Sequence, residues 1–397
     1  MLVLVINSGS SSIKYQVREV TGAPAGSAAD AAAAQVAGVE DAILTKGLIE
    51  NIGSSGAVAD HAEALDLLAA RLDEELNGRE IDVVGHRVVH GGERFSEPVL
   101  IDNEIVRTIE RLAPLAPLHN PAAALGIRAI QKKWPHLPQV AVFDTAFHRT
   151  LPERAWRYAI PDELYRLRGI RRYGFHGTSH DYVTGRAAEH LGVPREELDG
   201  VVAHLGNGAS VTAIKGGASV DTSMGYTPLA GLVMGTRSGD VDPSVLTALM
   251  TGPDAYDAEQ IDRVLNNESG LLAIGGSNDM RELVQRAEGG DEKARLALEM
   301  AAYRLVKYIG GYHVAVGGAR VLIFTAGIGE NSAPFRRLVV EGLGALGVTL
   351  DEEANAVRSD EIREISGPDS AITVLVVPTD EERAIAEAAV GLAGDRG

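Results

Sequence analysis

The chain has 397 residues, of which 45% are hydrophobic and 23% are charged, a composition that can bury a core of ordinary size and that predicts two folded domains rather than disorder. It contains no cysteine, which excludes disulfides, thiolate nucleophiles and cysteine-based metal sites and agrees with a reducing compartment. The formal net charge of −18 argues against nucleic acid or an anionic membrane as a partner. Met1 leads directly into a predicted strand and no apolar run reaches membrane-spanning length, so we expect a cytoplasmic protein.

The chain opens with a predicted β-hairpin whose turn is made of small polar residues. β-branched and leucine residues fill positions 2–6, the cluster Asn7-Ser8-Gly9-Ser10-Ser11-Ser12 follows, and an alternating run continues to position 17. A second unit of this kind spans residues 201–214 around Gly206-Asn207-Gly208. Turns of small residues let backbone N–H groups approach an anion. The pair therefore indicates a duplicated fold that holds a polyphosphate, and two ordinary surface hairpins are the alternative.

The elements after the first hairpin alternate between helix and strand. Residues 22–38 are low in complexity and predict a loop insertion or a short helix. A helix is predicted over 61–76, and the segment 151–172, rich in Pro, Arg and Tyr, predicts a change of domain. Buried strands are predicted over 81–89, 139–143, 320–324 and 372–377, and the last is followed by a helix that opens with three acids at 380–382. This alternation predicts an α/β fold with mixed sheets.

Two common nucleotide motifs are absent, and a zinc site is disfavoured. The sequence has no Gly-x-x-x-x-Gly-Lys-Ser/Thr run, and Gly327-Ile328-Gly329 lacks the third glycine of a dinucleotide fingerprint. His176 and His180 have the i, i+4 spacing of a zinc pair, but Gly177-Thr178-Ser179 between them disfavours the helix that such a site needs.

Polar residues gather at the ends of predicted strands, where α/β proteins place their ligands. They are Asn7, Arg87, Asp144, His176, Asn207, Arg237, Asp279, Arg281, Glu330, Asn331 and Glu381. For any one of them, a helix cap or a turn is the simpler interpretation. Arg237 is more specific, because its loop, residues 234–243, contains two glycines and two acids, and flexible backbone around a guanidinium suits phosphate recognition.

Eight motifs carry a resemblance to a known family. They span residues 7–14, 85–92, 117–121, 142–148, 173–180, 204–208, 234–243 and 324–332, and include Asn7-Ser8-Gly9-Ser10-Ser11-Ser12-Ile13-Lys14 and Tyr173-Gly174-Phe175-His176-Gly177-Thr178-Ser179-His180. With them the chain resembles the acetate kinases, in the superfamily of acetate and sugar kinases, heat-shock chaperones and actin. The resemblance covers nearly the whole chain.

The resemblance implies an α/β fold of two duplicated actin-like ATPase domains, ribonuclease H-like in topology, with an interdomain cleft. The first domain would span residues 1–149, completed by the C-terminal helix 382–397, and the second would span 150–381. The implied activity is reversible transfer of the ATP γ-phosphoryl group to acetate, giving acetyl phosphate and ADP. Mg²⁺ would be the metal, Mn²⁺ could replace it, and the protein would be a homodimer. Acetate is already ionised at neutral pH, so catalysis would consist of positioning and electrostatic stabilisation rather than general base catalysis.

The resemblance also implies roles for individual residues. The catalytic residues would be Asn7, Arg87, Asp144, His176 and Arg237. Arg87 and Arg237 would hold the carboxylate and the transferring group, and His176 would donate a hydrogen bond in the transition state. Asn7 and Glu381 would bind Mg²⁺, with Asp144 beside them. The ATP-binding residues would be Ser10, Ser12, Lys14, His204, Leu205, Gly206, Asn207, Gly208, Asp279, Met280, Arg281, Gly327, Ile328, Gly329, Glu330 and Asn331. Arg87, Val89, Leu118, Phe175 and Pro228 would bind the substrate, the last four around its methyl group.

Three features depart from the family pattern. The insertion at 22–38 is longer than the usual loop, and the segment 275–281 is a shortened form of a serine-rich one, which leaves the placement of Asp279 and Arg281 open. Asp380 stands where the family usually has Asn. The extra carboxylate leaves open whether Glu381 or a neighbour binds the metal.

Two other functions remain as alternatives. One is a kinase for propionate or butyrate, because a methylene in an apolar pocket changes binding by only ~1–3 kcal/mol. The other is a non-enzymatic ATP-driven switch. A switch would have no need for a carboxylate clamp of Arg87 and Arg237 beside an apolar patch.

Overall fold

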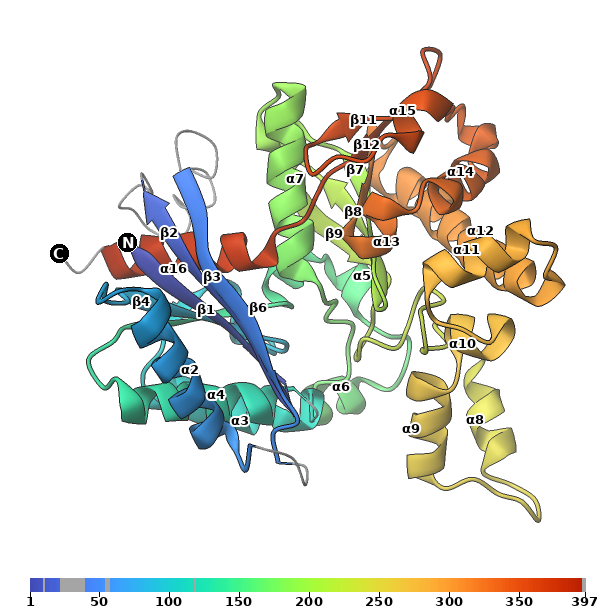
Figure 1. The fold of residues 1–397 in the computed structure, drawn as a ribbon. Helices are drawn as coiled ribbons and strands as arrows, with labels where there is room; N and C mark the ends of the chain where they lie inside the picture. The colour runs from blue at the N-terminus through green and yellow to red at the C-terminus, as the bar shows by residue number, and fades with distance from the viewer. Residues whose placement is uncertain (10, 22–39, 54–57, 118, 395–397) are drawn as a thin grey trace. The chain divides into compact units, whose positions relative to one another are not determined.

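The computed structural model describes residues 1–9, 11–21, 40–53, 58–117 and 119–394, which form two compact units (Figure 1). Unit 1 comprises Met1–Arg149, Gly177–Tyr182 and Asp380–Gly397, and unit 2 comprises Thr150–His176 and Val183–Thr379. Ser10, Leu118 and the predicted insertion at 22–38 lie outside the described residues. Within the described residues, no helix has both the length and the apolar character needed to cross a membrane.

Unit 1 is built on a mixed sheet with the strand order β3-β2-β1-β4-β6-β5. The strands are β1 (Leu2–Ser8), β2 (Ser12–Thr21), β3 (Glu40–Glu50), β4 (Val83–Val88), β5 (Val99–Leu100) and β6 (Gln139–Phe143). The helices are α2 (His61–Glu75), α3 (Asn103–Arg111), α4 (Asn120–Lys133) and α16 (Glu381–Gly394), with short 3₁₀ turns at Ala113–Leu115 and Ala146–Thr150. Helix α7 (Gly177–Leu191) begins in unit 1 and continues in unit 2.

Apolar side chains on both faces of β1 explain why helices cover both faces of this sheet. Val3 packs in one cluster with Ile385 of α16, whereas Leu4 packs in another with Leu65 of α2. Successive side chains of a strand point to opposite faces, so a fully apolar strand needs a partner on each side. Helix α16 lies so close that a Cβ on Gly85 would come within 2.5 Å of Ile385 Cγ2.

Unit 2 has a second mixed sheet with the order β11-β12-β10-β7-β8-β9. The strands are β7 (Gly200–Leu205), β8 (Ala209–Lys215), β9 (Ala218–Thr222), β10 (Val321–Thr325), β11 (Arg363–Glu364) and β12 (Thr373–Val376). The helices are α5 (Glu153–Trp156), α6 (Asp162–Arg168), α8 (Pro243–Leu249), α9 (Ala258–Asn267), α10 (Gly270–Gly275), α11 (Met280–Glu288), α12 (Glu292–Val316), α13 (Ala326–Asn331), α14 (Ala333–Gly342) and α15 (Glu352–Ala356). Short 3₁₀ turns lie at Arg195–Glu197 and Gly344–Leu346.

The two sheets have one topology. If β7 to β12 are matched in order to β1 to β6, strands that are neighbours in one sheet correspond to strands that are neighbours in the other. Strand directions match as well: β1–β4 and β7–β10 are parallel, and β1–β2 and β7–β8 are antiparallel. The predicted duplicated α/β fold is therefore confirmed, and both predicted Gly/Ser hairpins occupy the same place in their sheets.

The start of α7 corrects one prediction. Gly177-Thr178-Ser179 was expected to disfavour a helix, but α7 begins at Gly177. A Cβ on Gly177 would lie 2.2 Å from the carbonyl oxygen of Asp144, and the Gly177 N–H donates to that oxygen at 2.7 Å. This tertiary contact requires a glycine and outweighs its low helix propensity.

Candidate active site

In unit 1, Arg87 and Asp144 meet at the carboxyl ends of adjacent parallel strands. Arg87 lies near the end of β4 and Asp144 directly follows β6. Arg87 donates from Nε to Asp144 Oδ1 at 3.0 Å and from Nη2 to Oδ2 at 2.7 Å, a bidentate pair. Glu381, in the first turn of α16, brings Oε2 to 3.5 Å from Arg87 Nε.

Burial and mutual attraction set the protonation of this group. Burial disfavours the charged form of Arg87, but the carboxylates of Asp144 and Glu381 outweigh it and raise the Arg87 pKa. Burial raises the pKa of Asp144, and Arg87 opposes that shift. Arg87 therefore stays cationic, and its guanidinium is already oriented for a second anion.

The polar groups in and around the first hairpin turn of unit 1 differ in whether they already have a partner within the protein. Gly9 does not direct its N–H outward, because it donates to Ser12 O at 2.7 Å and closes the turn. Lys14 forms an ion pair with Glu382 of α16. Asn7 is half-buried at the end of β1, and its side chain has no hydrogen-bond partner among the described residues of unit 1. Val89 is half-buried just beyond β4.

In unit 2, His176 lies on the edge of the second hairpin. It precedes α7 with φ of 57°, a left-handed conformation that is uncommon for a residue other than glycine. His176 Nδ1 lies 2.9 Å from Ser210 Oγ, and its ring stacks on His204 with centroids 4.2 Å apart. His204 and Ser210 are paired across β7 and β8, so the hairpin fixes the imidazole.

Gly208 brings His176 and Arg237 together. A Cβ on Gly208 would lie 3.6 Å from His176 Nε2 and 3.4 Å from Arg237 Nη1. Gly235 of the Arg237 loop is much tighter, because a Cβ there would come within 1.9 Å of Asn207 Oδ1. The absence of a side chain at Gly235 therefore allows the Arg237 loop to approach the second turn closely.

Arg237 is a cation without a carboxylate partner in the described part of unit 2. It donates from Nη1 to the carbonyl oxygen of Pro228 at 3.1 Å, and burial lowers its pKa. A half-buried guanidinium that forms no ion pair in a strongly acidic chain is suited to bind an anionic ligand. The imidazole of His176 lies within reach of the same ligand.

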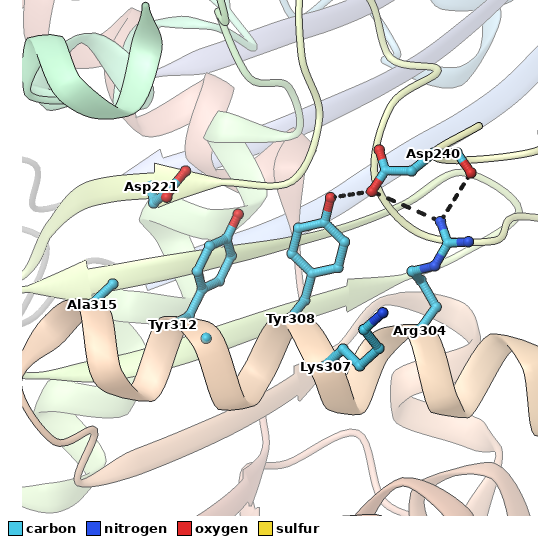
Figure 2. A pocket seen from close by; sticks show the side chains of 8 residues that line it. Asp221, Asp240, Arg304, Lys307, Tyr308, Tyr312 and Ala315 are labelled. Atoms are coloured by element: carbon cyan, nitrogen blue, oxygen red, sulfur yellow. Dashed lines mark hydrogen bonds and ion pairs between the residues drawn. The ribbon is translucent and has the colours of Figure 1, made fainter. Parts of the chain in front are cut away.

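Residues of α12 hold the segment 231–240, which contains Arg237, and Figure 2 shows their contacts to Asp240. Asp240 Oδ1 accepts from the Gly231 N–H at 2.8 Å, and Arg304 Nη1 donates to the carbonyl oxygens of Gly231 at 3.1 Å and Asp240 at 3.3 Å. Tyr308 donates its hydroxyl to Asp240 Oδ2 at 2.5 Å. These side chains line a pocket of about 560 Å³ that also includes Lys307. The contact between α12 and Asp240 was not predicted from the sequence, in which its only signal is the i, i+4 spacing of Arg304 and Tyr308.

Three other predicted nucleotide residues of unit 2, Asp279, Arg281 and Glu330, are held by hydrogen bonds within the protein. Asp279 caps α11 and pairs with Arg281, whose hydrogen bonds lower the Asp279 pKa to about 2, and the Arg281 side chain is 92% exposed. Glu330 points inward, because Oε1 accepts from the backbone N–H groups of Ala326 and Thr379 at 2.8 and 3.0 Å. Glu330 thereby holds the backbone that follows β10 and β12.

Four further predicted nucleotide residues border a small apolar cavity of about 20 Å³ in unit 2. Leu205, Gly206, Met280 and Ile328 are among its lining residues. Gly327 and Asn331 are exposed in α13, where Asn331 Nδ2 donates to the Gly327 carbonyl at 3.0 Å. Phe175 is buried beside His176, and Pro228 is half-buried.

Two copies of one α/β topology, with Arg87 and Asp144 paired at strand ends in unit 1 and His176 and Arg237 gathered at the second hairpin in unit 2, define a phosphoryl-transfer enzyme of the duplicated kinase class. The model of the acetokinase family matches residues 2–387. An acetate kinase of Kocuria rhizophila is 66% identical, over 100% of this chain and 99% of its own length. The chain therefore belongs to the acetokinase family, which confirms the predicted family and enzyme class.

Solved structures agree with this membership. The crystal structure of Porphyromonas gingivalis acetate kinase matches with a TM-score of 0.89 and 42% identity, over 98% of this chain and 99% of that one. A propionate kinase from Francisella tularensis matches with a TM-score of 0.85 and 40% identity, over 98% and 99% of the two chains.

Proposed function

We propose that this chain phosphorylates acetate with ATP and that Arg237 and His176 stabilise the transferring phosphoryl group. The observation that carries this proposal is the meeting at Gly208 of a fixed imidazole with a half-buried guanidinium that forms no ion pair in the described part of unit 2. Charge spreads over the phosphoryl oxygens in the transition state, so fixed donors aimed there lower the barrier. The test is a coupled assay of ADP formation with acetate, compared between the native chain and its Arg237 and His176 variants.

In unit 1, we propose that Arg87 holds the acceptor carboxylate and that Mg²⁺ with its nucleotide is bound by Asn7 and Glu381 beside Asp144. The donors fit the metal, because Mg²⁺ prefers oxygen ligands and takes one or two carboxylates together with phosphates and water. The described residues contain no cluster of three or more acids or histidines that would form an all-protein cage. Bound Mg²⁺ would neutralise charge on the β- and γ-phosphates, and Mn²⁺ could take its place.

Acyl size is a separate question, because the structural match to a propionate kinase is nearly as good as that to an acetate kinase. We propose that Val89, Phe175 and Pro228, together with Leu118, border the acyl methyl group. Turnover with acetate, propionate and butyrate in the same assay separates the candidates, and a kcat/KM that falls with each methylene supports acetate.

We also propose a cytoplasmic homodimer that associates through α12. Leu296, Met300, Tyr303 and Val314 are exposed, and their spacing places them along one stripe of the helix. A second copy of α12 would cover this stripe. Light scattering on the native chain and on Val314→Glu tests the proposal, because a monomeric variant supports it and an unchanged mass contradicts it.

A further inference from the structure

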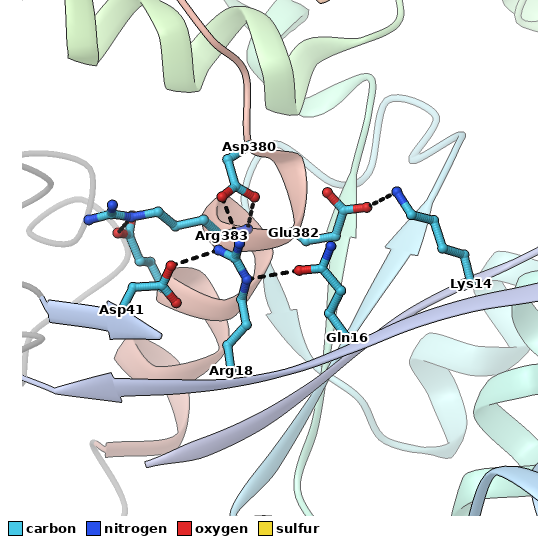
Figure 3. Close-up of polar contacts among 8 residues, drawn as sticks. Lys14, Gln16, Arg18, Asp41, Asp380, Glu382 and Arg383 are labelled. Carbon is cyan, nitrogen blue, oxygen red and sulfur yellow. Dashed lines mark hydrogen bonds and ion pairs between the residues drawn. The ribbon is translucent and has the colours of Figure 1, made fainter. Parts of the chain in front are cut away.

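Helix α16 opens with three consecutive acids, and Figure 3 shows two of them, Asp380 and Glu382, facing a row of polar side chains on β2. Asp380 immediately precedes the helix, and Glu381 and Glu382 lie in its first turn. Lys14 and Arg18 alternate along β2 with Gln16 between them, so all three side chains point to one face of the strand.

Arg18 is buried and holds Asp380. Its side chain is 1% exposed and donates from Nη2 to Asp380 Oδ2 at 2.6 Å, from Nη1 to Asp41 Oδ2 at 2.9 Å, and from Nε to Gln16 Oε1 at 3.0 Å. Asp380 uses its other oxygen, Oδ1, to accept the backbone N–H of Arg383 at 2.9 Å. Both oxygens of Asp380 are therefore occupied.

Lys14 holds Glu382 on the other side of Glu381. Lys14 Nζ donates to Glu382 Oε1, so the Lys14 ammonium is the charge partner of that carboxylate. The Lys14 side chain is 54% exposed, which makes this ion pair the weaker of the two. Among the described residues of unit 1, the ion pair recorded for Glu381 is the long 3.5 Å approach to Arg87.

We propose that Lys14 and Arg18 are positioning residues that occupy Asp380 and Glu382 and so leave Glu381 as the acid that α16 contributes to the metal–nucleotide complex. We call Lys14, Arg18, Asp380 and Glu382 the β2 clamp. Without the clamp, three carboxylates in one helical turn would compete for the same cation, and the start of α16 would lose its attachment to β2. This inference rests on the proposed function.

The primary test measures how strongly Mg²⁺ tightens ADP binding, as the Kd for ADP in EDTA divided by the Kd with saturating Mg²⁺. Arg18→Gln should lower this ratio by about 10-fold, the usual effect of losing a partner that orients a metal ligand. Adding Asp380→Asn to Arg18→Gln should restore most of the ratio, because the competing charge is gone and an amide oxygen can still cap α16. Arg79→Gln is the matched control, since it breaks the exposed ion pair between Arg79 and Glu19 of β2. This variant should change the ratio by less than about twofold.

A second arm tests Lys14, which the resemblance assigns to ATP. If Lys14 acts through Glu382, then Lys14→Met should lower the Mg²⁺ ratio, whereas Glu382→Gln and the double variant should keep it near the native value, because the competing carboxylate is gone. This arm stands even if Arg18→Gln fails to fold. A Lys14→Met variant with weaker ADP binding in EDTA would instead make Lys14 a direct nucleotide ligand.

Three other results would overturn the proposal. They are a native ratio near one, a native ratio in Arg18→Gln, and an Arg18→Gln/Asp380→Asn variant as impaired as Arg18→Gln alone. The last would show that Arg18 serves only the stability of the fold. If the native chain does not turn over acetate, the proposed function is contradicted, but the binding ratios can still be measured. Failure of the proposed function and failure of this inference are therefore distinguishable.

Discussion

Arg237 is the residue that the structure links most directly to catalysis, because its side chain is half-buried and forms no ion pair within the described residues. Arg237→Ala should lower kcat by about 10³-fold, in the range measured when a donor to transition-state charge is removed. Arg237→Lys should recover part of the loss, because a point charge does not replace a planar fork. Steady-state kinetics check this, with Arg337→Ala on the surface of α14 as the control. Near-native kcat in Arg237→Ala would contradict the assignment.

Val89 tests the proposed acyl pocket. It follows Arg87 by two residues and is half-buried, so its side chain can border the methyl group of a carboxylate held by Arg87. Val89→Ala opens room for one methylene and should raise the propionate-to-acetate ratio of kcat/KM by about 3- to 10-fold. Val193→Ala, beyond the end of α7, is the control. An unchanged ratio in Val89→Ala would place this residue outside the pocket.

The contacts of some single residues could be predicted from the sequence, and those of others could not. Arg87 and Asp144 could be predicted as neighbours, because polar residues at the ends of parallel strands share one edge of a sheet. The partner of Lys14 could not, because Glu382 lies 368 positions away and only tertiary structure brings it to β2. The inward turn of Glu330 onto two backbone N–H groups was equally hidden, since no local pattern distinguishes it from an exposed glutamate.

At the scale of elements, α12 should control the loop that carries Arg237. Tyr308→Phe removes one hydrogen bond to the Asp240 carboxylate, a bond to a charged group worth about 1.5–3 kcal/mol. The loop should then become mobile, and we expect kcat to fall about 10-fold, with faster proteolysis within residues 231–240. Kinetics and limited proteolysis check this beside Tyr256→Phe, whose exposed side chain lies just before α9. If both variants behave alike, α12 does not hold the loop.

The elements themselves were predicted well wherever the local pattern was strong. The hairpins at β1–β2 and β7–β8 follow from β-branched runs around small residues, and α2 follows from its helical spacing and its N-cap at Asp60. Helix α7 was missed, because its first turn depends on a glycine packed against the Asp144 carbonyl and not on propensity.

At the scale of the whole molecule, the duplicated topology is confirmed, and the domain boundaries at 149/150 and 381/382 remain a prediction. Limited proteolysis of the native chain tests them. Early cuts near 150 and 380, which divide the chain into two large stable fragments and a short C-terminal one, support the boundaries, and early cuts within the sheets contradict them.

Acid should destabilise unit 1 through two buried histidines. Burial lowers the pKa of His86, whose Nε2 lies 2.7 Å from Gln139 Oε1, and of His90 to about 4 each, against 6.5 ordinarily. Between about pH 6.5 and 4 the unfolded chain therefore binds protons that the folded chain does not, so stability falls as pH falls, by about 3 kcal/mol per histidine. His86→Gln should flatten the decline of Tm over this range, and exposed His136→Gln should not. Parallel curves for the native chain and His86→Gln would contradict the assignment.

The most direct test of the whole account is to trap the product of the native chain incubated with ATP, Mg²⁺ and acetate. Hydroxylamine converts an acyl phosphate into a hydroxamate, which can be quantified beside ADP. The account predicts one hydroxamate per ADP, dependence on acetate, and loss of both products in Arg237→Ala. ADP and inorganic phosphate formed at the same rate without acetate, and with no hydroxamate, would contradict it and would indicate an ATP-driven switch instead.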